Sequence, residues 1–448
     1  MKRFVRSTWF HRLGLALVTS SCITSSLLSD EANARNWPSW RGAHQNGQAS
    51  PAAKPPIRWD SKINLQWSTD LVGEGTSTPI VWEDQVFVLS AEVTDRKSEK
   101  IRTEDERSKT IAPDVYYRFH VTSLDRTSGK VRWSRVATEQ VPHEGHHETH
   151  TYAGGSPTTD GERLYVSFAS RGFYCYSLSG ELLWEVDLGD MRTRFGWGDA
   201  VTPVLAGDAL IINWDQEENS FLVSLDKRTG KILWKVARNK EVTSWNTPLV
   251  VHDSGRTLVV VNGTDRVRAY DVKDGKEQWE CGGQTINAIP SPIQFEDCVI
   301  CISGYRSAFG VSIPIRSEGD VTDSASLRWK IQQGTPYVPS PALSRGRVLF
   351  TAGNNGLLSC IDAKSGKTIV DRKRINGVSN IYASPLVANG HVYLVGRDGA
   401  TAVLREDTFE PVAVNSLEGT FDASPVSVGG QLLLRSWKRV YSLSESTK

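Results

Sequence analysis

Residues 225–234 read Leu-Asp-Lys-Arg-Thr-Gly-Lys-Ile-Leu-Trp, and related units occupy 124–133 and 270–279. Shortened or Trp-less versions occupy 178–184 and 361–367. In each unit the Asp can cap a turn, the Gly can adopt a positive φ, and a Trp on the next strand can pack against a neighbouring repeat. We therefore expect one shared structural role for Trp133, Trp184, Trp234, Trp279 and Trp329.

A second signature is a Ser/Thr-Pro pair that precedes a short apolar segment. It occurs eight times, at Thr78-Pro79, Ser156-Pro157, Thr202-Pro203, Thr247-Pro248, Ser291-Pro292, Ser340-Pro341, Ser384-Pro385 and Ser424-Pro425. Successive prolines are 40–49 residues apart, except for a first interval of 78 residues. A period of about 40–50 residues with strand-like segments between turns is typical of propeller blades of four strands. The spacing predicts an all-β, eight-bladed β-propeller of four-stranded blades.

The two ends of the chain complement each other. The last repeat supplies strands up to residues 440–443 and then ends, so it lacks an outer strand. Asn64-Leu65-Gln66-Trp67 carries the Trp of such a strand and has no other partner. We expect this N-terminal strand to close the ring, because closure removes an open sheet edge.

The repeated unit resembles the tryptophan-docking repeat of the pyrroloquinoline-quinone-like (PQQ-like) β-propellers, over about residues 63–443. That superfamily includes quinoprotein alcohol dehydrogenases and the propeller lipoprotein of the outer-membrane β-barrel assembly machinery. The sequence also resembles a secreted group whose mature chain starts with Trp37-Pro38-Ser39-Trp40-Arg41-Gly42. The resemblance implies the propeller fold over residues 63–448, with residues 35–62 as an N-terminal extension. One fold hosts many functions, so the function must come from a site.

Composition excludes several classes of protein. The 448 residues include 52 Lys+Arg and 51 Asp+Glu, for a formal net charge of +1. We therefore expect no nucleic-acid partner, because no excess of positive charge would attract one. Fifteen Trp, 37 Gly and 19 Pro beside 2 Met also favour many short strands over helices.

Residues 1–34 are typical of a secretory signal peptide. Lys2, Arg3, Arg6 and Arg12 precede an apolar stretch, and Ala32-Asn33-Ala34 supplies a small-residue cleavage site. We expect a periplasmic or extracellular protein with no transmembrane span. Lipoprotein anchoring at Cys22 is disfavoured, because Thr19-Ser20-Ser21 lacks the expected upstream Leu. The charged stretch 94–114 is expected to be a mobile insertion in the first blade.

The segments before the Ser/Thr-Pro pairs and the turns after the second strand of each blade should gather at one mouth of the central channel. The first set is rich in aromatic, amide and acidic side chains, as a polar-aromatic pocket requires. The expected ligand-binding residues are His150, Tyr152, Trp197, Asp199, Trp245, Asn246, Asn380, Tyr382 and Asp422. Asn287, Tyr337 and Phe421 occupy comparable places. The alternative is that these aromatic side chains only pack against neighbouring blades.

Quinone chemistry is not favoured by the residues. Among this family the dehydrogenases use a vicinal Cys pair beside the quinone, and the sequence has no adjacent Cys-Cys. Trp245, Asn246, Asp199 and Asp422 match the quinone and calcium ligands in type but not in motif. Cys301 is followed by Ile302, so no haem-attachment motif exists either. PQQ and calcium are possible cofactors that we do not expect.

The segment His143-Glu144-Gly145-His146-His147, continued by His150, satisfies a zinc-hydrolase pattern. That chemistry needs a helix, whereas Pro142 and Gly145 favour a solvated connection loop, so no metal site is assigned. The sequence as a whole indicates an exported binding or scaffold module rather than an enzyme. Its partners would be envelope proteins or a small ligand at the propeller mouth. The alternative is a PQQ-dependent oxidoreductase, and a zinc hydrolase is a third possibility.

Overall fold

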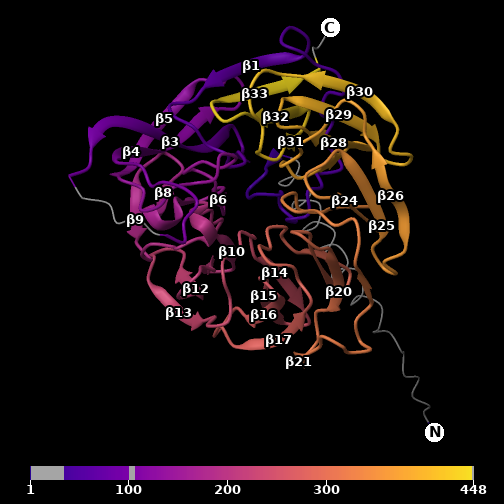
Figure 1. Ribbon diagram of the computed structural model, residues 1–448. Coiled ribbons are helices and arrows are strands. Elements are labelled where there is room, and N and C mark those ends of the chain that lie inside the picture. The colour runs from indigo at the N-terminus through magenta and orange to yellow at the C-terminus, as the bar shows by residue number, and fades with distance from the viewer. Residues whose placement is uncertain (2–34, 100–105, 446–448) are drawn as a thin grey trace.

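The computed structural model describes Met1, residues 35–99 and residues 106–445. Eight sheets surround a central channel, and the chain visits them in order around the ring (Figure 1). Seven sheets have four strands, and one has an additional two-residue strand at its outer edge. The predicted all-β, eight-bladed propeller of four-stranded blades is confirmed.

Blades 1 to 4 occupy the first half of the ring. Blade 1 contains β2 (Ile80–Trp82), β3 (Gln85–Lys97), β4 (Val115–Asp125) and β5 (Val131–Gln140). Blade 2 contains β6 (Thr158–Thr159), β7 (Arg163–Ser167), β8 (Phe173–Ser177) and β9 (Leu182–Val186). Blade 3 contains β10 (Val204–Ala206), β11 (Ala209–Trp214), β12 (Phe221–Asp226) and β13 (Ile232–Ala237). Blade 4 contains β14 (Leu249–Asp253), β15 (Arg256–Asn262), β16 (Arg266–Asp271), β17 (Glu277–Gly282) and the added β21 (Gly319–Asp320).

Blades 5 to 8 complete the ring. Blade 5 contains β18 (Ile293–Phe295), β19 (Cys298–Ser303), β20 (Phe309–Pro314) and β22 (Trp329–Ile331). Blade 6 contains β23 (Ala342–Ser344), β24 (Arg347–Thr351), β25 (Leu357–Asp362) and β26 (Thr368–Arg374). Blade 7 contains β27 (Leu386–Ala388), β28 (His391–Val395), β29 (Ala400–Arg405) and β30 (Pro411–Ser416). Blade 8 contains β31 (Val426–Val428), β32 (Gln431–Arg435), β33 (Arg439–Ser444) and β1 (Leu65–Asp70).

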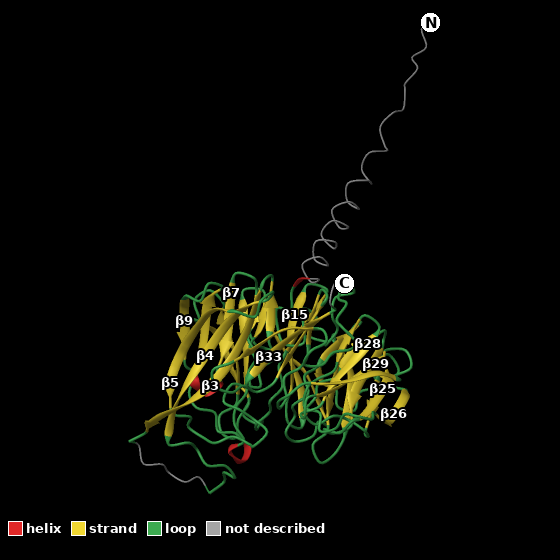
Figure 2. Ribbon diagram, turned by 90° about the horizontal axis from the view of Figure 1, so that it is seen from above, coloured by secondary structure: helices red, strands yellow, loops and turns green. Residues whose placement is uncertain are grey.

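The central strands of each blade are apolar on both faces because neighbouring blades cover both of them. Val259, Val260 and Val261 of β15 have no exposed surface, and neither do Val299 and Ile300 of β19. A strand that is buried on both faces therefore appears in the sequence as a continuous run of apolar residues. The loops at one end of the ring are longer, and the short helices η1 (Ala169–Arg171) and η2 (Arg194–Gly196) lie among them (Figure 2).

The ring closes through the N-terminal strand. β1 pairs antiparallel with β33, with Leu65 opposite Leu443 and Thr69 opposite Val440. The two strands lie side by side in Figure 1, although they come from opposite ends of the chain. The predicted closure is confirmed, and blade 8 gains its fourth strand from residues at the start of the propeller.

Each of six outer-strand tryptophans bonds to the next blade. The indole N–H donates to a backbone carbonyl at 2.8–3.1 Å, in the pairs Trp67–Arg126, Trp133–Leu178, Trp184–Lys227, Trp234–Val272, Trp279–Ile315 and Trp329–Ala363. Gly230 shows why the turn uses glycine. Its φ is +71°, and a Cβ there would lie 2.8 Å from the Trp184 ring. A turn of one blade thus receives the indole of the blade before it.

The junction between blades 6 and 7 uses a different pair. Val370 stands on β26 opposite Cys360, as Trp234 stands on β13 opposite Ser224. Phe409, with a φ of +57°, occupies the turn position that glycine holds in the other units. Phe409 is 2% exposed and packs in the same apolar cluster as Val370. A large side chain on the turn therefore replaces the large side chain on the strand.

The eight Ser/Thr residues of the Ser/Thr-Pro pairs follow one another around the channel, and we call them the Ser/Thr ring. Hydrogen bonds join seven of the eight neighbouring pairs, and Thr202 with Thr247 is the exception. A backbone N–H of one member donates to the hydroxyl of the next at 2.8–3.1 Å, in the order Thr78 to Ser156, Ser156 to Thr202, Thr247 to Ser291, Ser291 to Ser340, Ser340 to Ser384, Ser384 to Ser424, and Ser424 to Thr78. These seven bonds join the inner ends of the blades to one another.

Residues 36–49, which we call the channel segment, lie inside the ring against its innermost strands. Trp37 pairs with Val81 of β2, and Gln48 pairs with Val387 of β27. The carbonyl of Asn46 accepts the N–H of Leu343 from β23. Figure 1 shows this indigo segment within the ring. It therefore joins inner strands from blades that lie far apart along the chain.

Some sequence expectations concern residues outside the described ranges. The signal peptide over 1–34 and Cys22 lie there, apart from Met1, and so do residues 100–105 of the expected insertion. The described flanks of that insertion include the end of β3 and the residues before β4, with Lys97 opposite Val115. Within residues 35–99 and 106–445, no helix has the length and apolar character needed to cross a membrane.

Truncation after Lys438 tests the closure of the ring. It removes β33, so β1 loses its partner and blade 8 retains two strands. The whole domain should unfold at a lower temperature, because the opened ring exposes apolar edges. The measurement is thermal unfolding by circular dichroism, with a chain that ends at Glu445 as the control. A truncated protein that melts like this control would contradict the closure.

Replacement of Trp279 by Ala tests the tryptophan contact. Trp279 has no exposed surface, so the change should reduce the free energy of unfolding by about 3–5 kcal/mol. Trp234 is half-buried, and Trp234→Ala should cost less. Chemical denaturation of both variants measures the difference. Equal, near-zero losses would show that the indoles do not hold the blades together.

Candidate functional site

A cavity of about 490 Å³ occupies the channel at the end where the loops before the Ser/Thr-Pro pairs meet. Its lower boundary includes Trp40 of the channel segment and six members of the Ser/Thr ring: Thr78, Ser156, Thr202, Thr247, Ser384 and Ser424. Its size is within the range of small-molecule sites. The channel segment lies on the far side of the Ser/Thr ring from the loops, so the open approach to the cavity is from the loop side.

Five of the nine predicted ligand-binding residues line this cavity. They are His150, Trp197, Trp245, Tyr382 and Asp422. Tyr337, from the wider set of comparable positions, lines it as well. The sequence rule that located the loops therefore brings side chains from blades 2, 3, 4, 6, 7 and 8 to one place.

Aromatic rings form one wall of the cavity. Trp197 and Trp245 stack with ring centroids 6.3 Å apart and planes inclined by 28°. The indole N–H of Trp245 donates to the Gly198 carbonyl at 2.8 Å, which holds its ring in place. Tyr305 meets Trp197 edge-on at 6.4 Å and lies 4.8 Å from Tyr337. This wall can stack a flat or apolar ligand.

Tyr305 and Trp40 are lining residues that the sequence analysis missed. Tyr305 follows β19 in the turn after the second strand of blade 5, and such turns were expected at this mouth. That rule could have found it. Trp40 belongs to no repeat, and no periodic signal places it under the cavity.

Asp422 faces the cavity but is already paired. Its carboxylate accepts from Arg397 Nε at 2.7 Å and from the Trp437 indole N–H at 2.6 Å. Burial raises the pKa of Asp422, and the bonds from Arg397 and Trp437 oppose that effect. Arg397 also lies over the Tyr382 ring, 4.8 Å from its centroid. The charge of Asp422 is therefore balanced within the wall.

Four predicted residues do not line the cavity. The Asp199 carboxylate accepts the backbone N–H of Ser170 at 3.0 Å and its hydroxyl. Tyr152 packs edge-on against His146 at 4.6 Å. Asn380, with a φ of +51°, accepts the Arg397 backbone N–H through its own carbonyl. These three residues support the loops rather than the cavity surface.

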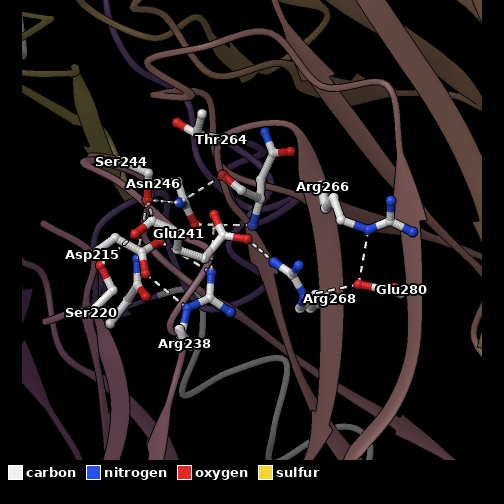
Figure 3. A network of polar contacts seen from close by, with 12 residues as sticks. Asp215, Ser220, Arg238, Glu241, Ser244, Asn246, Thr264, Arg266, Arg268 and Glu280 are labelled. Atoms are coloured by element: carbon white, nitrogen blue, oxygen red, sulfur yellow. Dashed lines mark hydrogen bonds and ion pairs between the residues drawn. The ribbon is translucent and has the colours of Figure 1, made fainter. Parts of the chain in front are cut away.

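The fourth residue, Asn246, belongs to a buried polar network (Figure 3). Its amide donates to Ser244 Oγ at 3.0 Å and to the Asn262 carbonyl at 2.8 Å. Ser244 in turn donates to Asp215, which is fully buried and paired with Arg238 at 2.7 Å. Neighbours in sequence thus serve different purposes, because Trp245 faces the cavity while Asn246 is used by the packing between blades 3 and 4.

The His143–His150 segment is a connection loop, as expected, but some of its side chains are packed against protein partners rather than solvated. The Glu144 carboxylate accepts from the Thr193 hydroxyl at 2.5 Å and from its backbone N–H at 3.1 Å. His150 Nε2 lies 3.0 Å from the Asp199 carbonyl. In the part of the chain that the structure describes, no three His, Cys, Asp or Glu side chains gather closely enough to hold a metal ion. The segment forms no helix there, so the geometry of a zinc hydrolase is missing.

Burial shifts the titration of two groups in this loop. It raises the pKa of Glu144 to about 7, with a further increase from the nearby Asp199 charge, while Thr193 and His143 act in the opposite direction. It lowers the pKa of His150 to about 4, so His150 is neutral at physiological pH. Thr193 Oγ1 also accepts the N–H of Gly198, beside Trp197. Glu144 therefore connects to the aromatic wall through Thr193.

Comparison with known families gives one match that covers most of the chain. A family model described as outer membrane protein assembly factor BamB matches residues 118–332 and 322–412. The outer membrane protein assembly factor BamB of Shewanella oneidensis is 23% identical over 231 residues, which is 50% of this chain. The match spans 42% of the length of that relative.

Solved propellers superpose over more of the chain. The crystal structure of BamB from Moraxella catarrhalis has a TM-score of 0.51 at 12% identity and covers 79% of this chain and 99% of that one. A europium-containing methanol dehydrogenase has a TM-score of 0.63 at 11% identity and covers 94% of this chain and 100% of that one. At these identities the likeness shows the fold alone.

Replacement of Glu144 by Gln tests the buried carboxylate. Because its pKa is raised on folding, the folded state keeps a proton that the unfolded state releases, and stability is lost as the pH rises through about 7. The stability of Glu144→Gln relative to wild type should therefore increase between about pH 5 and about pH 8, by on the order of 2 kcal/mol. Urea denaturation at each pH measures it.

Glu148→Gln is the matched control, because Glu148 is exposed on the same loop. It should follow the wild type at each pH. A constant difference between Glu144→Gln and the wild type would contradict the assignment of Glu144 as the titrating group.

Proposed function

This chain belongs to the family of outer membrane protein assembly factor BamB, and we propose that it is an exported binding or scaffold module of the cell envelope. The proposed activity is binding of a ligand in the cavity above the Ser/Thr ring. One observation carries this proposal: aromatic side chains from separate blades converge on a cavity of about 490 Å³ that the channel segment closes from beneath. A concave site of this kind, on a rigid ring, is where ligands bind in proteins.

The state of the titratable groups favours binding over catalysis. A general acid or base must be free to reach a substrate. Asp422 is engaged by Arg397 and Trp437, and His150 lies against the Asp199 carbonyl. The sequence also lacks the adjacent cysteines that quinoprotein dehydrogenases use. His147 also lines the cavity, with its Nδ1 2.8 Å from Thr149 Oγ1 and its ring edge-on to Trp197. The described lining therefore offers mainly stacking faces and hydroxyl groups.

The sequence and the family support the proposed export and the proposed partners. Residues 1–34 are typical of a secretory signal, which would deliver the domain to the periplasm or the exterior. The printed name of the relative in Shewanella oneidensis describes an assembly factor of outer membrane proteins. By analogy, envelope proteins are the proposed partners for the outside of the ring, and a small ligand is the proposed partner for the cavity.

Native mass spectrometry of the full chain purified from its own envelope tests the proposed function. The wild type should carry a bound small molecule, and Trp197→Ala with Trp245→Ala should lose it because both stacking faces disappear. Trp234→Ala is the control, since Trp234 lies outside the cavity. It should lose stability and keep the ligand. Retention of the same molecule by the double variant would move the site away from the cavity.

A further inference from the structure

The hydroxyl groups of the Ser/Thr ring have an unusual hydrogen-bonding state. In seven of the eight neighbour pairs, the hydroxyl oxygen accepts a backbone N–H from the adjacent blade. In the described structure, none of the eight hydroxyls donates its own hydrogen to a protein acceptor. A hydroxyl has one hydrogen to donate, so each ring member keeps an unused donor. Six of the eight face the cavity: Thr78, Ser156, Thr202, Thr247, Ser384 and Ser424.

A buried cation lies directly beneath this ring. Arg41 of the channel segment is 2% exposed and donates to the carbonyls of Pro341 and Pro385. These prolines follow the ring members Ser340 and Ser384. Arg41 Nε has no acceptor, and Arg41 has no ion pair with any of the described carboxylates. An unpaired buried charge is costly, and it attracts a counter-charge.

A second unpaired cation lies beside the ring at the junction of blades 8 and 1. Arg435 is 1% exposed, and it donates to the Ser77 carbonyl at 2.6 Å and to the Leu89 carbonyl. Ser77 directly precedes the ring member Thr78. Two other arginines are buried, Arg238 and Arg268, and both have ion pairs with carboxylates. Among the buried arginines that the structure describes, only the two that flank the ring lack an ion pair.

Both flanking arginines stay charged at neutral pH. Desolvation by burial lowers the pKa of Arg41 to about 9 and that of Arg435 to about 9. The one carboxylate that lines the cavity, Asp422, is balanced by Arg397. Arg41 and Arg435 thus place two buried positive charges beside the ring that form no ion pair with a described carboxylate.

The geometry points to an oxyanion site at the base of the cavity, formed by the six lining hydroxyls above Arg41. A carboxylate, sulfate or phosphate group of the ligand would accept hydrogen bonds from neighbouring members of this set. Its apolar or aromatic body would lie against Trp197, Trp245 and Tyr305. Hydrogen bonds to an anion are about twice as strong as those between neutral groups, so several convergent donors can select an anionic ligand. This inference rests on the proposed function, because it names the ligand class of the same cavity.

Titration calorimetry of the purified full chain tests the site with a charged and a neutral probe of the same shape. The probes are 1-naphthoate and 1-naphthamide, and inorganic phosphate and sulfate serve as competitors. Naphthoate should bind at least about tenfold more tightly than naphthamide. Displacement of naphthoate by phosphate or sulfate would show that a free oxyanion is sufficient for binding at this site. If neither phosphate nor sulfate displaces naphthoate, but naphthoate still binds more tightly than naphthamide, the aromatic wall contributes part of the affinity. That result supports a ligand that combines an oxyanion with an aromatic body.

Two pairs of substitutions separate the donors from the structural bonds. Ser384→Ala with Ser424→Ala removes two lining hydroxyls and two bonds of the ring. Ser291→Ala with Ser340→Ala also removes two bonds of the ring, but neither residue lines the cavity. Both pairs should lower the melting temperature. The first pair alone should weaken naphthoate at least about tenfold, and Arg41→Gln should weaken it in the same direction.

Three results would overturn the oxyanion site. They are equal binding of naphthamide and naphthoate, equal weakening by the two pairs of substitutions, and no binding of naphthoate. If both probes bind equally and Trp197→Ala with Trp245→Ala abolishes both, the cavity binds ligands without selecting anions. The proposed function would then survive while the oxyanion site fails. If that double variant binds both probes like the wild type, both fail together.

Discussion

The hydrogen bonds of the Ser/Thr ring determine how closely the blades approach one another at the channel. Each bond joins a backbone N–H of one blade to a hydroxyl of the next, so the spacing repeats around the circle. Each member of the Ser/Thr ring is followed by a proline, which has no backbone N–H to donate. The N–H of the ring member itself therefore makes the hydrogen bond to the next blade. This inner circle sets the width of the channel, and the width decides both which segment fits beneath it and how large the cavity above it is.

A second set of contacts holds the blades at the outside. Tryptophans on outer strands donate to carbonyls in the turn of the next blade, and glycine in the turn makes room for the indole. The two sets act at different radii, so together they resist both sliding and tilting of a blade. Strand β1 extends this arrangement across the junction of the termini, since Trp67 reaches blade 1 in the same way.

Much of this architecture could be predicted from sequence because the repeats carry it locally. The Ser/Thr-Pro period and the Asp-x-x-Thr-Gly-Lys-x-x-Trp unit each report a contact that recurs in most copies. The exchange at Phe409 and Val370 was not predictable, because it replaces both members of a pair in different repeats.

The lining of the cavity was predicted in part. Loop position placed Trp197 and Trp245 correctly, but side-chain direction in a loop depends on tertiary partners. For that reason the Asn246 side chain bonds within a buried network, and the Asp199 carboxylate bonds to Ser170, instead of lining the cavity. Trp40 and Arg41 lie outside the repeats, so periodicity could not connect them with the channel.

The most direct measurement is a crystal structure of the full chain soaked with 4-bromobenzoate, with the bromine located by its anomalous scattering. The account predicts the carboxylate within hydrogen-bonding distance of the Ser384 and Ser424 hydroxyls, with the bromine on the side of Trp197 and Trp245. Bromine found only outside the cavity would contradict it. So would ring hydroxyls that donate to protein carbonyls, because the ring would then have no donors to offer.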